Sequence, residues 1–160
     1  MANYEWFRTK PNGSLKVKQA YGIIYNYDGN VLLRVENDKF KLSGGKPEVT
    51  DLNYEETLKR ELWEELNTEV DNIEYLGYLI VTDGNEQYVQ LRYIGTIKNI
   101  GENRPDIDTG IMYKRFMSNQ KNVKKYLNYS DAAGNKMIDE ANEIANKKYK
   151  FEYSDKEYYV

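Results

Sequence analysis

The sequence predicts an α/β layered domain in which strands are interspersed with about three helices. Two turn signals, Asp28-Gly29 and Asp83-Gly84-Asn85, each lie between runs rich in β-branched and aromatic residues. Between residues 53 and 67, apolar side chains repeat every four positions, as they do in a helix. A chain of 160 residues with 40% hydrophobic side chains suits one domain with its own core, spanning residues 1–160.

The first elements are a predicted hairpin and a glycine loop. Residues 16–38 form two strand-like runs about Asp28-Gly29, a pair suited to the positive φ angles of a tight turn. Residues 40–52 follow as a strand end and a loop. Within this loop, Gly44 and Gly45 permit close approach of another part of the chain because they carry no side chain.

The strongest helix prediction covers residues 53–67. Asn53 is placed to cap the first turn, and Glu56 stands at the capping-box position. Asn67 is a suitable left-handed stop. The apolar positions that repeat every four residues, and so define the buried face, are Tyr54, Leu58, Leu62 and Leu66.

The second half of the chain continues the mixed pattern. Strands are predicted at residues 73–82, 87–97 and 111–117, with a polar loop over 98–110. A helix beginning at a Ser118 cap should end near Leu127, and a longer helix is predicted over 132–148. Residues 128–160 are expected to be a helical extension and a tyrosine-rich tail.

Composition excludes several classes of function. The net charge is only -3, so no basic field is available to bind duplex nucleic acid through its phosphates. No apolar run is long enough to span a membrane, and the absence of cysteine fits a cytoplasmic protein. Without cysteine or histidine, catalysis must come from carboxylates, Lys, Arg, Tyr or an oxygen-bound metal.

The predicted helix carries three glutamates close to its apolar face. On a helical wheel Glu65 falls inside the roughly 120° apolar arc, with Glu61 and Glu64 to one side of it. Burying an ionised carboxylate without a partner costs several kcal/mol, so something must compensate Glu65. Arg60 can pair with one glutamate, whereas Mg²⁺ or Mn²⁺ can gather all three. A solvated, charged helix is the alternative interpretation.

These residues resemble the Nudix hydrolase signature, in which Gly, five residues, Glu and seven residues precede Arg-Glu-aliphatic-x-Glu-Glu-x-Gly-aliphatic. The segment Arg60-Glu61-Leu62-Trp63-Glu64-Glu65 matches the six central positions. Gly45 matches the opening glycine if one residue is inserted before Arg60, and Asp51 then replaces the first Glu. Asn67 and Thr68 replace the closing pair.

The resemblance implies a Nudix-like α/β/α sandwich with a central mixed β-sheet. It also implies a Mg²⁺- or Mn²⁺-dependent enzyme that cleaves a pyrophosphate bond in a nucleoside diphosphate linked to another group. The implied metal ligands are Gly45, Glu61, Glu64 and Glu65. The implied catalytic set is Glu61, Glu64 and Arg60, with Arg60 orienting Glu61.

Several points stay open at this stage. A further general base is expected among Glu102, Asp106 and Asp108, and the substrate's second group is undefined. The candidates for stacking a nucleobase are Tyr21, Tyr93 and Phe116, and each of them also suits a core position. The alternative function is a Nudix-like module that binds or senses a nucleotide without cleaving it. Exposed aromatics in the tail make a homodimer a further expectation.

Overall fold

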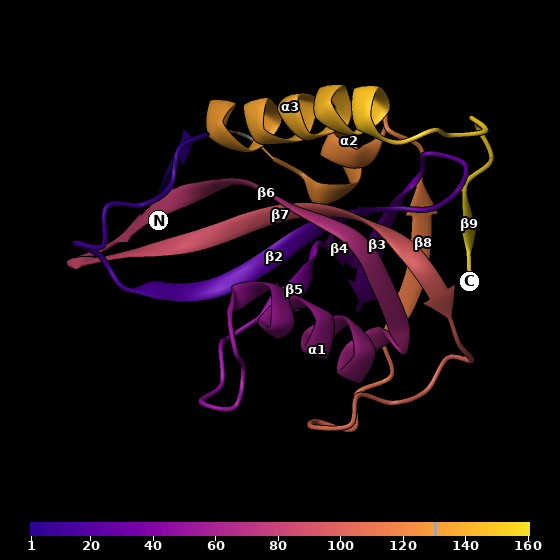
Figure 1. Ribbon diagram of the computed structural model, residues 1–160, viewed down its shortest axis with the longest axis horizontal. Helices are drawn as coiled ribbons and strands as arrows, with labels where there is room; N and C mark the ends of the chain where they lie inside the picture. The colour runs from indigo at the N-terminus through magenta and orange to yellow at the C-terminus, as the bar shows by residue number, and fades with distance from the viewer. Residues whose placement is uncertain (130) are drawn as a thin grey trace.

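The protein is a mixed β-sheet with helices on both faces (Figure 1). The computed structural model describes residues 1–129 and 131–160. One core cluster forms between the sheet and α1, around Leu58, Leu62 and Leu66. A second lies between the sheet and the other two helices, with Met137 and Ala141 among its members. The predicted α/β/α sandwich with a central mixed sheet is therefore confirmed.

The strands form one sheet in the order β1-β6-β7-β2-β3-β8-β9, with β4 beside β3 and β5 beside β2. Their bounds are β1 Asn3–Phe7, β2 Val17–Tyr25, β3 Val31–Glu36, β4 Lys39–Lys41, β5 Ser43–Gly45, β6 Thr68–Asp83, β7 Glu86–Ile100, β8 Lys114–Ser118 and β9 Tyr158–Tyr159. The helices are α1 Tyr54–Leu66, α2 Val123–Leu127 and α3 Ala132–Lys148. None of the described helices is both long and apolar enough to cross a membrane.

The first predicted hairpin has the expected turn but not the expected pairing. Gly29 adopts a positive φ of 77°, as the turn requires. However, β2 and β3 pair only at Tyr25 and Val31, because β2 pairs instead with β5 and, in parallel, with β7. The two strands therefore diverge beyond the turn. Strands β4 and β5 occupy the space between them, β4 beside β3 and β5 beside β2.

The second predicted hairpin is correct and longer than expected. Strands β6 and β7 pair from Thr68–Ile100 to Asp83–Glu86, with Gly84 in the turn at a φ of 60°. Irregularities in this register, at three places, allow the long strands to bend across the fold. The pairing of β1 with β6 was not predicted from the sequence.

The helix α1 follows the sequence prediction closely. The Asn53 side chain accepts a hydrogen bond from the backbone N–H of Glu56 at 2.9 Å, and so caps the first turn. Asn67 ends the helix in the left-handed conformation, with φ 46° and ψ 45°. These two caps fix the register of the glutamates between them.

The region after β7 departs from the prediction in two places. The predicted strand over 111–117 begins later, at Lys114, and Ser118 ends it instead of capping a helix. The short helix α2 starts only at Val123, after Asn122. The longer helix is correct, and the Asp131 side chain caps it by accepting a hydrogen bond from Gly134 N–H at 2.7 Å.

The C-terminal tail packs on the domain. Tyr158 and Tyr159 pair with β8 as β9, and the Glu157 carboxylate accepts a hydrogen bond from the Tyr126 hydroxyl at 2.8 Å. The ring of Phe151 packs against that of Tyr25 in a tilted arrangement, with centroids 5.6 Å apart. The tail is thus held against β8, α2 and the end of β2.

Candidate active site

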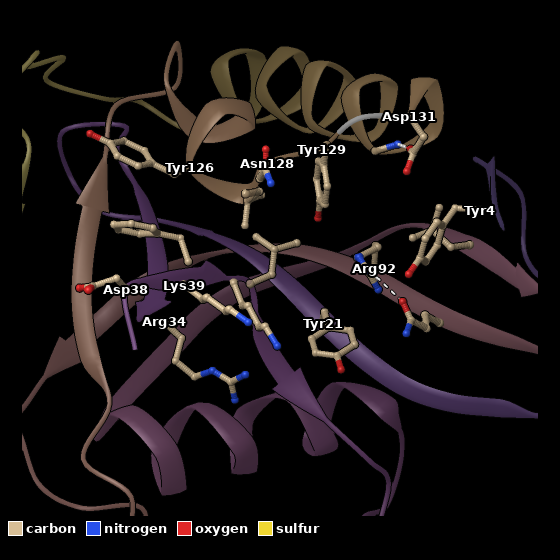
Figure 2. Close-up of a pocket in the computed structure, with 17 residues that line it drawn as sticks. Tyr4, Tyr21, Arg34, Asp38, Lys39, Arg92, Tyr126, Asn128, Tyr129 and Asp131 are labelled. Atoms are coloured by element: carbon tan, nitrogen blue, oxygen red, sulfur yellow. Dashed lines mark hydrogen bonds between the residues drawn. The ribbon is translucent and has the colours of Figure 1, made fainter. Parts of the chain in front are cut away.

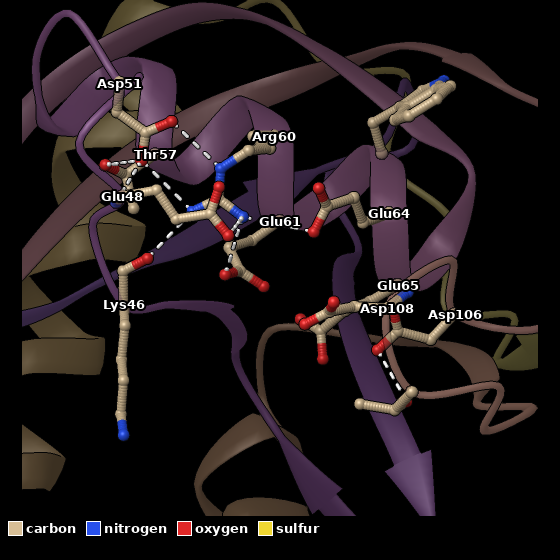
Figure 3. Close-up of polar contacts among 12 residues, drawn as sticks. Lys46, Glu48, Asp51, Thr57, Arg60, Glu61, Glu64, Glu65, Asp106 and Asp108 are labelled. Atoms are coloured by element: carbon tan, nitrogen blue, oxygen red, sulfur yellow. Dashed lines mark hydrogen bonds and ion pairs between the residues drawn. The ribbon is translucent and has the colours of Figure 1, made fainter.

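The three glutamates of α1 lie on the side of the helix that faces β3 and β5 (Figure 3). Glu65 is only 5% exposed, as its place in the apolar arc predicted. Glu61 and Glu64 are partly exposed, with 17% and 20% of their side-chain areas accessible. The structure therefore brings the predicted acidic residues together at the edge of the core.

Gly45 lies in contact with this cluster. A Cβ atom built on Gly45 would collide with the carboxylate of Glu61. Gly44 has a φ of 151°, and a side chain there would collide with the backbone of β2. The glycine pair is therefore required for the close approach of β5 to α1 and β2, which leaves the Gly45 backbone beside a carboxylate.

Arg60 is the centre of a network of polar contacts (Figure 3). Its Nη1 donates to Oε1 of Glu61 and to Oε2 of Glu64, each at 3.1 Å. Its Nη2 donates to the carbonyl oxygen of Lys46 at 2.8 Å. The sequence predicted that Arg60 pairs with one glutamate. In the structure one nitrogen reaches two, because the guanidinium bends toward the next turn.

Asp51, which replaces the first Glu of the signature, holds Arg60 from the other side. Its carboxylate accepts hydrogen bonds from Arg60 Nε at 3.0 Å and from the Thr57 hydroxyl at 2.8 Å. The hydrogen bond from Arg60 lowers the pKa of Asp51 to about 2. Asp51 therefore stays ionised and positions the arginine that touches Glu61 and Glu64.

Glu65 has a partner that the sequence analysis missed. Arg34, from β3, forms an ion pair with Oε2 of Glu65 and lies over the ring of Tyr113, 4.6 Å from its centroid. The other oxygen of Glu65, Oε1, is buried and has no hydrogen-bond partner. Arg34 thus compensates part of the charge that the sequence analysis assigned to a cation.

The acidic cluster retains uncompensated charge. Burial, followed by repulsion from Glu65, raises the pKa of Glu61 to about 7, although Arg60 opposes the shift. Burial also raises the pKa of Glu65, with Arg34 acting in the opposite direction. Carboxylates whose ionised forms are disfavoured in this way gain free energy from a nearby cation.

Loop 101–113 covers the C-terminal end of α1. Arg104 donates to the carbonyl of Glu64 at 3.0 Å and lies over the ring of Trp63. Asp106 is 6% exposed, and its charge contributes to the raised pKa of Glu65. Its oxygens accept hydrogen bonds from within the loop, from Asp108 N–H and the Thr109 hydroxyl.

Of the three candidates for a further base, Asp106 is thus the one whose charge reaches Glu65. Glu102 is exposed, and its backbone carbonyl accepts a hydrogen bond from Asn67 beyond the end of α1. Asp108 is also exposed. The loop that carries them was recognised from the sequence, but its contacts with α1 were not.

The donor set fits a divalent cation. Among residues 1–129 and 131–160, no three acidic side chains converge closely enough to form a metal-binding group. In this arrangement Glu65 pairs with Arg34, and Glu61 and Glu64 pair with Arg60. Even so, Glu65 has a buried oxygen without a hydrogen-bond partner, and the raised pKa of Glu61 shows that its ionised form is unfavourable. Glu61 in turn lies against the backbone of Gly45, which has no side chain. Such all-oxygen donors suit Mg²⁺ or Mn²⁺.

The pH dependence of stability tests this charge balance. The raised pKa of Glu61 means that its proton stabilises the folded protein below about pH 4.5, and that this stabilisation is lost as the pH rises to about 7. Glu65 shifts in the same direction. In EDTA, the free energy of unfolding should therefore fall more between pH 5 and pH 8 in the wild type than in Glu61→Gln, by about 1–3 kcal/mol.

Urea unfolding at several pH values measures this difference. Equal pH dependence in the two proteins would contradict the proposed charge balance. Saturating Mg²⁺ should reduce the fall in the wild type at pH 8, because the cation binds the ionised form.

A cavity of about 640 Å³ lies between the sheet and the α2–α3 region (Figure 2). Its lining residues come from several strands, among them β2, β3, β4 and β7, and from the segment that joins α2 to α3. Arg34 connects it with the cluster, since this side chain lines the cavity and also pairs with Glu65. Its basic lining residues are Arg34, Lys39, Lys41 and Arg92, and its tyrosines are Tyr4, Tyr21, Tyr126 and Tyr129.

A ligand in the cavity would contact the aromatic residues that line it. Tyr21 lines it, as one of the three candidates for base stacking. Tyr93 and Phe116 do not line it. They are 6% and 7% exposed and belong to the two core clusters, so they are core residues.

The layered fold, the glycine pair and the glutamate-bearing helix define a hydrolase that acts on phosphoric anhydride bonds. The chain belongs to the Nudix family, because the family model described as NUDIX domain matches residues 16–133. The predicted family and enzyme class are therefore confirmed. A comparison with curated proteins found no match.

Solved structures of Nudix proteins share the fold. The Bacillus subtilis pyrophosphohydrolase BsRppH is 21% identical, with a TM-score of 0.69, and the alignment covers 88% of this chain and 90% of that chain. The NUDIX domain of Shewanella oneidensis NrtR, solved with ADP ribose, is 18% identical, with a TM-score of 0.59 and coverages of 81% and 88%. MutT from Bacillus halodurans is 22% identical, with a TM-score of 0.55 and coverages of 75% and 77%.

Proposed function

We propose that the protein is a Mg²⁺- or Mn²⁺-dependent pyrophosphohydrolase that cleaves the anhydride in a nucleoside diphosphate linked to another group. The observation that carries this proposal is the position of the acidic cluster. Glu61 lies against Gly45, Glu64 and Glu65 follow on the same helix, and Arg34 links Glu65 to a cavity with basic and tyrosine side chains. Acidic groups for a cation and basic groups for phosphates then lie within reach of one substrate.

In this proposal the carboxylates of Glu61, Glu64 and Glu65 and the Gly45 carbonyl hold the cation. When bound, the cation offsets phosphate charge and lowers the pKa of a water molecule. Glu61 or Glu64 accepts the proton of the attacking water. Arg60, fixed by Asp51, keeps these two carboxylates in place and so acts as a positioning residue.

The cavity then holds the rest of the substrate. Lys39, Lys41 and Arg34 contribute positive charge at the side nearest the acidic cluster, where the phosphates would lie. Tyr21 lines the floor of the cavity on β2 and offers a ring to the nucleoside. ADP ribose bound to the NUDIX domain of NrtR is one ligand of the proposed class.

A panel of nucleoside diphosphate derivatives tests the proposal. Nucleotide sugars, dinucleoside polyphosphates, ADP-ribose and nucleoside triphosphates should be compared with Mg²⁺ and with Mn²⁺. At least one should release a nucleotide product, and EDTA should abolish the reaction. Calorimetric binding of a nucleotide without turnover under either metal would contradict the proposal and favour a sensing module. The cytoplasmic location, the homodimer and the extension over residues 128–160 remain predictions.

A further inference from the structure

Arg92 is a buried cation in the wall of the cavity. It lies on β7, is only 6% exposed and lines the cavity with Tyr21 (Figure 2). Its guanidinium carbon is 4.8 Å from the centroid of the Tyr21 ring. Stacking of this kind fixes the plane of the guanidinium, so its remaining N–H groups have defined directions.

The hydrogen bonds of Arg92 are incomplete. Nη1 donates to the carbonyl oxygen of Leu91 at 3.2 Å, and Nη2 donates to Oε1 of Gln90 at 3.1 Å. Nε is buried and has no partner. Both acceptors are neutral, and within the described part of the chain Arg92 forms no ion pair. Asp131, which also lines the cavity, caps α3.

An unpaired buried guanidinium is costly. Burial lowers the pKa of Arg92, although the surrounding tyrosines, Tyr129 foremost, act in the opposite direction. Nη1 and Nη2 each carry a second N–H besides the one that Leu91 or Gln90 accepts. Because Arg92 borders the cavity, these two parallel donors are placed to bind the acceptors of a ligand.

The strand register at Tyr21 gives the distance from Arg92 to the glycine pair beside the acidic cluster. In the sheet Tyr21 lies opposite Gly44 on one side and opposite Arg92 on the other. Arg92 is therefore two strand spacings, about 10 Å, from the glycine pair. That separation suits a nucleotide with its phosphates at the glutamates and its base at Arg92.

The cavity is chemically divided along this direction. Lys41 lies opposite Arg34 in the sheet, whereas the amide of Gln90 and the ring of Tyr21 contact Arg92. The ring of Tyr129 also lines the cavity. Rings stack nucleobases, and amides and guanidinium groups read their edges. This end of the cavity therefore matches a base better than a second phosphate.

We propose that Arg92 selects a 6-oxopurine base, guanine or hypoxanthine, by donating to the adjacent O6 and N7 acceptors. Arginine makes this bidentate contact with guanine, because both edge atoms accept hydrogen bonds. Adenine presents an amino donor at position 6, which would face the donors of Arg92. Pyrimidines have no N7 acceptor. The inference rests on the proposed function and names its substrate class.

Binding of four diphosphates to the wild-type protein in EDTA is the first test. GDP and IDP should bind about 5- to 150-fold more tightly than ADP and 7-deaza-GDP. The analogue 7-deaza-GDP differs from GDP in the N7 acceptor, so it isolates the contact without any mutation. Equal affinities for the four compounds would overturn the assignment.

Arg92→Lys is the matching variant, because it keeps a positive charge but removes the planar pair of donors. It should bind GDP and ADP with similar affinity, with the loss confined to GDP. An equal loss for both would show that Arg92 binds a phosphate and would overturn the base assignment. Arg8→Lys is the control, since Arg8 lies outside the cavity and pairs with Glu140. It should leave the preference unchanged.

Hydrolysis assays separate this inference from the proposed function. Metal-dependent cleavage of guanine and adenine substrates at equal kcat/KM would overturn the role of Arg92 and leave the hydrolase intact. Preferential GDP binding without cleavage of any guanine nucleotide would support the role of Arg92 and count against the hydrolase.

Discussion

Glu65→Gln and Glu61→Gln should each lower kcat/KM for metal-dependent hydrolysis by about 10²- to 10⁴-fold. Glutamine keeps the shape of each side chain but removes the negative charge that a hard divalent cation requires. The loss should be accompanied by weaker binding of Mn²⁺, measured by calorimetry without substrate. Steady-state kinetics over a range of Mg²⁺ and Mn²⁺ concentrations measure the catalytic loss.

Glu56→Gln is the control for these variants. Glu56 lies in the first turn of the same helix, and its side chain is 44% exposed. Among the residues that the structure describes, it forms an ion pair with Lys59 alone. Its removal should leave activity and Mn²⁺ binding unchanged. Full activity in Glu65→Gln would refute the assignment of the helix carboxylates, whatever the substrate is.

The sequence predicts α1 and its acidic face well because the signals are local. Asn53 and Asn67 cap the helix through contacts within a few residues, and the four-residue repeat fixes which side is buried. The burial of Glu65 follows from these facts alone. A wheel drawn from the sequence is sufficient here, since no distant strand alters the register of a helix with two strong caps.

Pairing between strands is less predictable because distant segments compete for the same edge. The Asp28-Gly29 turn was correct, yet β2 pairs with β7, which lies more than sixty residues later, rather than along β3. This divergence leaves room for β4, which lines part of the cavity. It could not be predicted from the turn signal, which specifies only the first pair after the turn.

The ion pair between Arg34 and Glu65 had a signal that was overlooked. Arg34 stands in an apolar run between Leu33 and Val35, and a charge within a buried strand requires a partner. The alternation along β3 places Arg34 on the opposite face from these two neighbours. A buried cation on the α1 side of the sheet and a buried anion on α1 are mutually compensating.

Arg34→Met should therefore destabilise the metal-free protein by about 3–5 kcal/mol at pH 8. The substitution leaves Glu65 ionised, 5% exposed and without its partner. Urea unfolding in EDTA measures the loss. Burial raises the pKa of Glu65, and the variant lacks the opposing charge of Arg34. Glu65 should therefore bind a proton as the pH falls to 5, so the loss should shrink because no buried charge remains.

The double variant Arg34→Met, Glu65→Gln separates a lost ion pair from lost packing. It should recover most of the stability at pH 8, since no buried charge remains. Arg34 and a cation also compete for the same carboxylate if Glu65 is a ligand. Mg²⁺ should then stabilise Arg34→Met more than it stabilises the wild type. Equal stabilisation of the two proteins by Mg²⁺ would place the cation away from Glu65 and leave Arg34 as the sole partner of that carboxylate.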